Sequence, residues 1–289
     1  MGISALWGIL ASTCILVAFS TAVVLVYRAN HVLAFHVGEI GVVAAYVAST
    51  VAGMQPTPTG ALISVTLGLG SALVIGGISH IVVDRWGGSR GHFVGTVLTI
   101  AIGIVIMGTV SLIWAGESRR LVLVGGRTQF LGTSIPWNTL VVIASCLLSV
   151  IFIQLIVRFT RFGIDMRAVA NSPRLAEIRG IPVKRVLLAT WLMASGLAGI
   201  GGICVAAISS VTMEGSQVGI GAVVAAILGG MTSLYGAVIG AVLIASAEHG
   251  VTMFVSARYS QVVPVLALLA VLAVRPSGLS GRTERIERV

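Results

Sequence analysis

The chain has 289 residues, of which 57% are hydrophobic and 9% charged, and its mean hydropathy is +1.07. Soluble domains usually carry about 25% charged residues, so this composition excludes a soluble protein and predicts one that crosses a membrane several times. The net charge of +9 could indicate nucleic-acid binding. However, the basic residues lie between apolar stretches and form no single solvated face, which is the pattern of cytoplasmic loops in membrane proteins.

Apolar stretches long enough to cross the hydrocarbon core, which takes about 20 residues, follow one another along the chain. They cover residues 5–27, 32–53, 60–83, 93–115, 138–157, 186–208, 217–247 and 259–274. The first is followed by Arg28 and preceded by no basic residue, the reverse of a cleavable signal peptide, so we expect a retained helix with its N-terminus outside. The expected fold is an all-α transmembrane bundle with about 7–9 crossings.

The stretch 217–247 would be about 46 Å long as one helix, too long for a core of about 30 Å. Its glycines predict a break near Gly229-Gly230 to Gly236, giving two short helices or a re-entrant pair. Non-helical backbone at membrane depth is tolerated only where it lines a cavity or is buried in protein, so this segment is predicted to belong to a transport path.

The break also makes the number of crossings between the basic loop 158–185 and the basic C-terminal tail even. This is the number required if both are cytoplasmic, as their basic residues predict, and Arg28 and residues 84–90 then fall on the same side. Residues 54–59 and 116–137 then fall outside, the latter in spite of Arg119, Arg120 and Arg127.

A short helix is predicted inside the loop 158–185. Ser172 can cap its N-terminus, Pro173 suits the first helical position, and Gly180 can adopt the left-handed conformation after its end. A helix of about seven residues is marginal alone in water, so it is expected to dock on a soluble partner.

Catalytic motifs are missing from the sequence. It has no Walker loop and no HExxH signature, and its three cysteines lie in apolar stretches without metal-ligand spacing. We therefore expect neither an enzyme nor a metal site. Glu39 is the one formal charge inside an apolar stretch. It is interpreted first as a structural hydrogen bond to a neighbouring helix, and second as a substrate contact.

Four segments resemble the permease subunits of branched-chain amino acid ABC importers. They are residues 34–40, which include His36, Gly38 and Glu39; residues 167–183; residues 228–240, which include Thr232; and residues 275–279, which read Arg-Pro-Ser-Gly-Leu. The matches occur in the family's order across almost the whole chain, which makes 1–289 one transmembrane permease domain including the coupling loop 158–185.

The resemblance implies a multi-pass protein of the bacterial inner membrane, embedded in lipid and without nucleic acid as a partner. A second, homologous permease subunit, an external solute-binding protein and two cytoplasmic ATPases would complete the importer. ATP and Mg would bind to those ATPases, and this chain would hold no cofactor. The resemblance also implies a segment that couples the permease to the ATPases, made of Ser172, Pro173, Arg174, Leu175, Ala176, Glu177, Arg179 and Gly180. It further implies a translocation path near His36, Gly38, Glu39, Gly229, Gly230, Thr232 and Gly236.

The expected substrate is a branched-chain or related hydrophobic amino acid, with urea, short amides or another small organic solute as alternatives. His36 is displaced by one residue from the family's histidine, which on a helix is a rotation of about 100°. An ion-coupled secondary transporter is the competing class, but seven of the eight apolar stretches lack the charged residues that such a transporter needs. A membrane scaffold would need neither the glycine break nor the capped helix.

Overall fold

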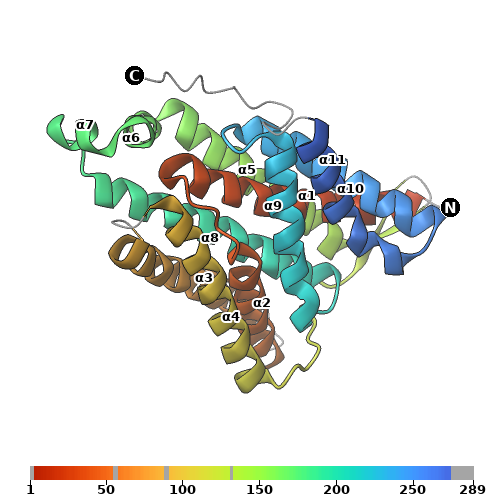
Figure 1. Cartoon of the computed structure of the whole chain (residues 1–289). Coiled ribbons are helices and arrows are strands. Elements are labelled where there is room, and N and C mark those ends of the chain that lie inside the picture. Colours follow the sequence, from red (N-terminus) through yellow and green to blue (C-terminus); the bar gives the residue numbers. More distant parts are fainter. Residues whose placement is uncertain (1–2, 55–57, 88–90, 131–132, 275–289) are drawn as a thin grey trace.

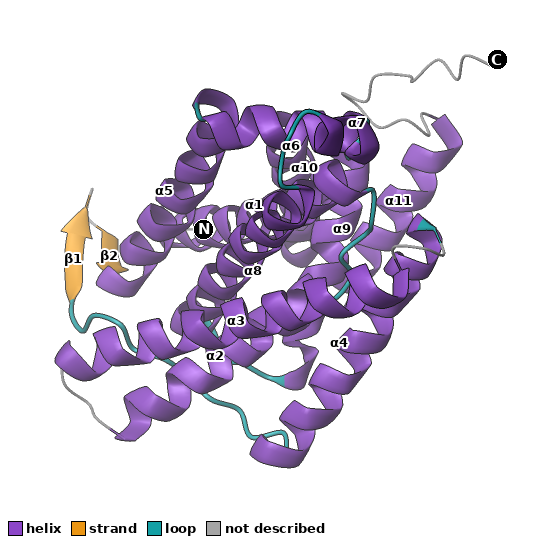
Figure 2. Ribbon diagram, turned by 90° about the vertical axis from the view of Figure 1, so that its left-hand side faces the viewer, coloured by secondary structure: helices purple, strands orange, loops and turns teal. Residues whose placement is uncertain are grey.

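The structure is a computed structural model that describes residues 3–54, 58–87, 91–130 and 133–274. Within these ranges the chain is almost entirely helical (Figure 2). The long helices are α1 (Ile3–Asn30), α2 (Val37–Met54), α3 (Pro58–Gly87), α4 (His92–Trp114), α5 (Trp137–Phe159), α8 (Val183–Ile208) and α10 (Leu234–Phe254). The short ones are α6 (Arg161–Asn171), α7 (Pro173–Ile178), α9 (Gln217–Gly229) and α11 (Val263–Val274), with two 3₁₀ turns, η1 (Met213–Ser216) and η2 (Ala257–Val262).

Six of the described helices are long and apolar enough to cross a membrane, and three shorter apolar helices accompany them. This confirms the predicted polytopic helical bundle. Helices α1 and α8 form its interior, with 78% and 67% of their apolar windows buried, whereas the other four spans have at most 28% buried. Helices α2 and α3 pack against α8, with α4 packed on α3 and α2, and α5, α9 and α10 surround α1.

Glycines let α2 approach α8 to backbone contact. A Cβ atom added at Gly202 would collide with the backbone carbonyl of Gly41, and one added at Gly41 would lie 2.6 Å from the Phe19 ring. Helix association within lipid has no hydrophobic driving force and depends on such close packing. The small residues of α8 therefore explain why this helix is interior.

Helices α1 and α8 run between two ends of the molecule, one at α7 and the other at the N-terminus (Figure 1). The α7 end carries α6, α7 and the last turns of α1 and α5; the hairpin end carries the start of α1 and the β-hairpin. Asp84 and Arg85 at the end of α3 border the same cavity as Lys184 and Arg185 at the start of α8. The basic segments predicted to share one side therefore do so, except the C-terminal tail, which lies outside the described residues.

The loop 116–137 holds a two-stranded antiparallel hairpin that the sequence analysis missed, with β1 (Arg127–Phe130) paired to β2 (Thr133–Pro136). It lies away from the α7 end, as predicted. Arg119 is fixed there by an ion pair with Glu117 at 3.0 Å, a hydrogen bond donated to the Thr50 hydroxyl and backbone pairing with Val211. This basic residue therefore has a structural role.

The stretch 32–53 was predicted as one span, and this is wrong at its start. Residues 31–36 are not helical, and α2 begins at Val37. The amides of Leu33 and Phe35 donate hydrogen bonds to the hydroxyls of Thr96 and Thr99 on α4. These hydroxyls replace intrahelical partners, which lets the backbone stay non-helical inside the protein. The expected 100° displacement of His36 on a helix therefore does not apply.

The predicted break in 217–247 is confirmed. Helix α9 ends at Gly229, Gly230 has a φ of +102°, and α10 begins at Leu234 with the Ser233 hydroxyl accepting a hydrogen bond from the Gly236 amide. With 13 residues, α9 is about 20 Å long, too short to cross a core of about 30 Å.

Replacing Gly202 with Ala tests the α2–α8 contact. The added methyl group would overlap the Gly41 carbonyl, and overpacking of this kind costs about 1–3 kcal/mol. We expect a lower midpoint when the purified full-length chain is unfolded thermally. Gly196→Ala, in the same helix, is the control, because its nearest neighbour would lie 3.7 Å away. Equal midpoints for the two variants would contradict this contact.

Candidate functional site

The short helix α7 forms as the sequence predicts. The Ser172 hydroxyl accepts a hydrogen bond from the Leu175 amide, and Pro173 occupies the first turn. Gly180 follows the helix with a φ of +80° and donates its amide to the Glu177 carbonyl. The helix is shorter than predicted by one residue at its C-terminal end, because Arg179 is already the cap.

Helix α6, which the sequence analysis did not predict, anchors α7. It buries Gly163, Met166 and Val169 against the rest of the protein. Gly163 is required there, since a Cβ atom would collide with the Val157 carbonyl of α5. Helices α5 and α8 are therefore connected to α7 through short, packed segments, and a displacement of α7 would act on both.

The surface of α7 combines apolar and basic side chains. Ala176 is buried and holds the helix to the protein, whereas Leu175 and Ile178 are 62% and 75% exposed. Arg174, Glu177 and Arg179 are exposed beside them. An exposed i, i+3 apolar pair with flanking charges, on the tip of the molecule, is suited to docking a protein partner.

His36 and Glu39 come together where α2 faces α4 and α8. The His36 ring is 1% exposed and lies 5.7 Å from the Trp191 ring, and both side chains lie beside Gly103 of α4. The expected interhelical hydrogen bond of Glu39 is not formed: its Oε2 atom is buried without a partner among the described residues. These two residues line neither of the two cavities described below.

The glycines assigned to the translocation path mainly permit backbone contact. A Cβ atom at Gly38 would lie 2.7 Å from the Ser216 carbonyl oxygen, and one at Gly229 would collide with the Gly236 carbonyl. Gly230 supplies the positive φ of the break. Thr232 is different, because with Ser233 it borders a cavity of about 400 Å³ at the α7 end.

A larger cavity of about 500 Å³ opens at the hairpin end. Its apolar wall comes from α1, α8, α9 and α11, with Ile15, Leu16, Val205, Ile208, Ile220 and Val265 among its members. The cavity lies at the C-terminal end of α8, whereas α7 precedes the N-terminal end of that helix. At 1.5 Å per residue, the length of α8 separates the two by roughly 39 Å. We call this cavity the hairpin-end cavity.

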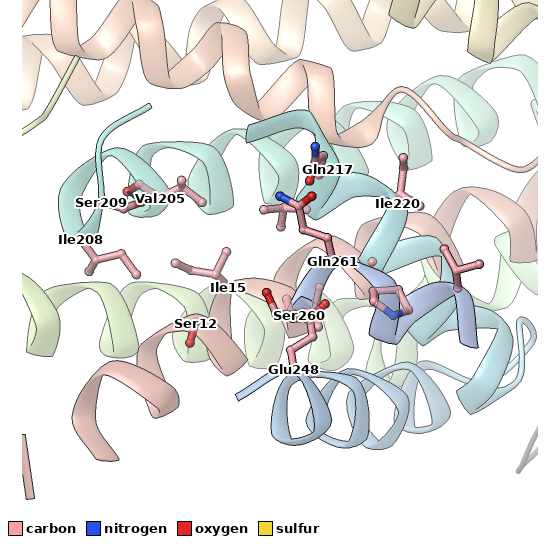
Figure 3. Close-up of a pocket in the computed structure, with 15 residues that line it drawn as sticks. Ser12, Ile15, Val205, Ile208, Ser209, Gln217, Ile220, Glu248, Ser260 and Gln261 are labelled. Carbon is pink, nitrogen blue, oxygen red and sulfur yellow. Dashed lines mark hydrogen bonds between the residues drawn. The ribbon is translucent and has the colours of Figure 1, made fainter. Parts of the chain in front are cut away.

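A few polar side chains converge in this cavity. Gln217, Gln261 and Glu248 lie together in the middle of Figure 3, with Val205 and Ile208 to their left. Cavities of about 300–1,000 Å³ with apolar walls and a few polar groups are typical small-molecule sites. Glu248 directly follows the apolar stretch 217–247 in the sequence, and nothing in the sequence alone distinguishes this carboxylate or the two amides as parts of one site.

An apolar bundle with a cavity at one end and an exposed docking helix at the other is the arrangement of a membrane transport protein. The family model described as "Branched-chain amino acid transport system / permease component" matches residues 5–272. The chain belongs to this family of transport permease components, and the resemblance stated from its motifs is confirmed.

Curated relatives are about a quarter identical to this chain over the segments that align. The high-affinity branched-chain amino acid permease LivH of Escherichia coli K12 is 28% identical over 48% of this chain and 46% of its own length. A LivH protein of Methanocaldococcus jannaschii is 28% identical over 56% and 54%. The L-arabinose ABC transporter permease AraH of Azospirillum brasilense is 24% identical over 66% and 58%. The chain spans about half the length of the LivH relatives it matches.

A solved structure shares the fold. A metal-chelate type ABC transporter in an inward-facing conformation aligns with a TM-score of 0.52 at 14% identity, covering 92% of this chain and 84% of the other. At this identity the likeness concerns the helical architecture alone.

Proposed function

We propose that this chain is a permease subunit of an ABC importer that carries a branched-chain or related hydrophobic amino acid. The family match to residues 5–272 and the two LivH relatives support this. The hairpin-end cavity carries the argument for the substrate: its Glu248 carboxylate and two glutamine amides suit an ammonium group, and its aliphatic wall suits an apolar side chain.

In this proposal the hairpin end faces the outside and receives solute from an external binding protein. The α7 end faces the cytoplasm, as does the C-terminus, and the protein resides in the inner membrane. ATP and Mg are bound by two separate ATPase subunits that contact α7, and a second permease subunit completes the path. Closure of the ATPases would displace α7, and α5 and α8 would move with it.

The AraH relative introduces a second substrate class, a pentose sugar. A sugar has no ammonium group for Glu248 and no aliphatic side chain for the Ile15–Ile208 side of the cavity. The cavity therefore favours the amino acid over the sugar.

Purification from the native membrane tests the proposed assembly. The tagged chain, extracted in a mild detergent, should bring down a second permease and subunits that contain Walker motifs, identified by mass spectrometry. A chain that is recovered alone under conditions that preserve uptake would overturn the proposal. Uptake driven by an ion gradient in that preparation would instead indicate a secondary transporter.

Replacing Gly180 with Val should uncouple ATP hydrolysis from uptake. A Cβ atom at Gly180 meets nothing within 4 Å, so the only obstacle is its φ of +80°, which a β-branched residue resists. The end of α7 would be distorted while the membrane fold is kept. Gly180→Asn is the control, since asparagine tolerates this conformation. In the reconstituted complex, normal substrate-stimulated ATPase activity and uptake in Gly180→Val would remove α7 from the coupling mechanism.

Replacing Glu248 with Gln should weaken the transport of leucine. A hydrogen bond to a charged group contributes about 1.5–3 kcal/mol, so its loss should raise the KM for uptake by about tenfold or more. Glu117→Gln is the control, because Glu117 lies at the same end with its side chain 66% exposed. Unchanged leucine uptake would remove Glu248 from the site, and uptake of L-arabinose without leucine would favour the sugar.

A further inference from the structure

The cavity of about 400 Å³ at the α7 end gathers basic side chains from three helices. Arg28 is in the last turn of α1, Arg158 in the last turn of α5, and Arg167 in α6. The break between α9 and α10 closes it through Thr232, Ser233 and Tyr235. We call it the arginine cavity.

None of the described residues that line this cavity is acidic. Arg28 is half-buried and makes no hydrogen bond or ion pair with a described residue, and it lies close enough to Arg167 for mutual repulsion. Over the described ranges the recorded ion pair is Arg119–Glu117, at the opposite end. Arg158 and Arg167 are exposed beside the half-buried Arg28. Like charges gathered at one cavity repel one another, and an anion bound between them would remove this repulsion.

The polar groups around the arginines also suit an anion. Arg158 donates to the Tyr235 hydroxyl at 2.8 Å, which leaves the O–H group of Tyr235 free to donate in turn. The first turn of α10 starts at the cavity wall, with Ser233 as its cap. The N-terminus of a 21-residue helix carries free amides and a partial positive charge.

We propose that the arginine cavity binds a phosphate group, with Arg28, Arg158 and Arg167 as its charged ligands and the first turn of α10 as an additional donor. Guanidinium groups match phosphate oxygens in paired hydrogen bonds. The phosphate can come from the headgroup of an anionic phospholipid, because Arg28 and Arg158 end membrane-spanning helices at the depth of the headgroups. It can also be free inorganic phosphate.

A bound phosphate would join parts of the protein that are separate along the chain. Its ligands belong to α1, α5 and α6, and the α9–α10 break forms the opposite wall. Because α6 carries α7, the phosphate would stabilise the position of the coupling segment relative to α10. This inference depends on the charges and the cavity, and it stands independently of the substrate assignment.

Lipid and phosphate binding can be measured on the full-length chain with its co-purifying subunits. Nanodiscs of phosphatidylcholine, with or without phosphatidylglycerol, supply the lipid arm, and native mass spectrometry counts the phosphatidylglycerol retained. The same phosphatidylcholine nanodiscs with added inorganic phosphate, followed by thermal unfolding, supply the free-ion arm. In whichever arm shows binding, we expect the double variant Arg28→Gln/Arg167→Gln to bind phosphatidylglycerol or inorganic phosphate more weakly, by a factor of about ten or more.

Arg85→Gln is the matched control, because Arg85 is also in the last turn of a spanning helix at this end but lies outside the arginine cavity. Arg158→Gln, an exposed position, serves if the double variant fails to fold. Phosphatidylglycerol retention lost only in the cavity variants identifies a lipid site, and a phosphate-induced stabilisation lost only in them identifies a free-ion site. If the wild type and the cavity variants behave alike in both arms, the proposal is wrong.

Discussion

The need to pair every backbone amide and carbonyl inside a lipid-embedded protein governs where this chain is allowed to leave the helical conformation. Three interruptions among the described residues show how the missing partners are supplied. The hydroxyls of Thr96 and Thr99 serve residues 31–36, the Ser233 hydroxyl serves the start of α10, and Arg119 pairs its backbone with Val211 beyond α8. The three interruptions therefore end helices inside the bundle. The break before α10 borders the arginine cavity, and residues 31–36 include His36, which was assigned to the path.

The two cavities lie at opposite ends of the same helices. Helix α1 contributes Ser12 to the hairpin-end cavity and Arg28 to the arginine cavity, and α10 contributes Glu248 to the first and Tyr235 to the second. Between these positions α1 and α10 are tightly packed, with Ala22, Val23 and Ala241 almost completely buried. A solute that enters at one end therefore meets a closed middle. The proposed transport therefore requires α1 to move relative to α10, and α7 lies at the end where the ATPases are proposed to act.

Features that depend on neighbouring residues were predictable from the sequence. Features that depend on contacts between distant residues were not. The cap of α7, the positive φ of Gly180 and the break after Gly229 follow from short-range residue preferences, and the structure confirms them. The non-helical start of the stretch 32–53 depends on two threonines more than 60 positions away, which composition does not reveal. The hairpin-end cavity escaped notice for the same reason: Ser12, Gln217 and Gln261 are unremarkable one by one, and only the fold brings them together. Arg119 looked misplaced on its side of the membrane until its partners were known.

The glycine contacts between helices have a consequence for how the protein can change shape. Gly41 meets Gly202, Gly38 meets Gly219, and Gly229 meets Gly236, so α8, α2, α9 and α10 form a chain of backbone-to-backbone contacts. Long side chains can exchange rotamers while two helices slide, but touching backbones cannot adjust in this way. We therefore expect these four helices to rotate as one rigid block when α7 is displaced. Helix α3 joins this block through Gly68, where an added Cβ atom would lie 2.7 Å from the Ala44 carbonyl oxygen of α2. The boundary that slips would then be that of α5, which makes no such glycine contact with these helices among the described residues.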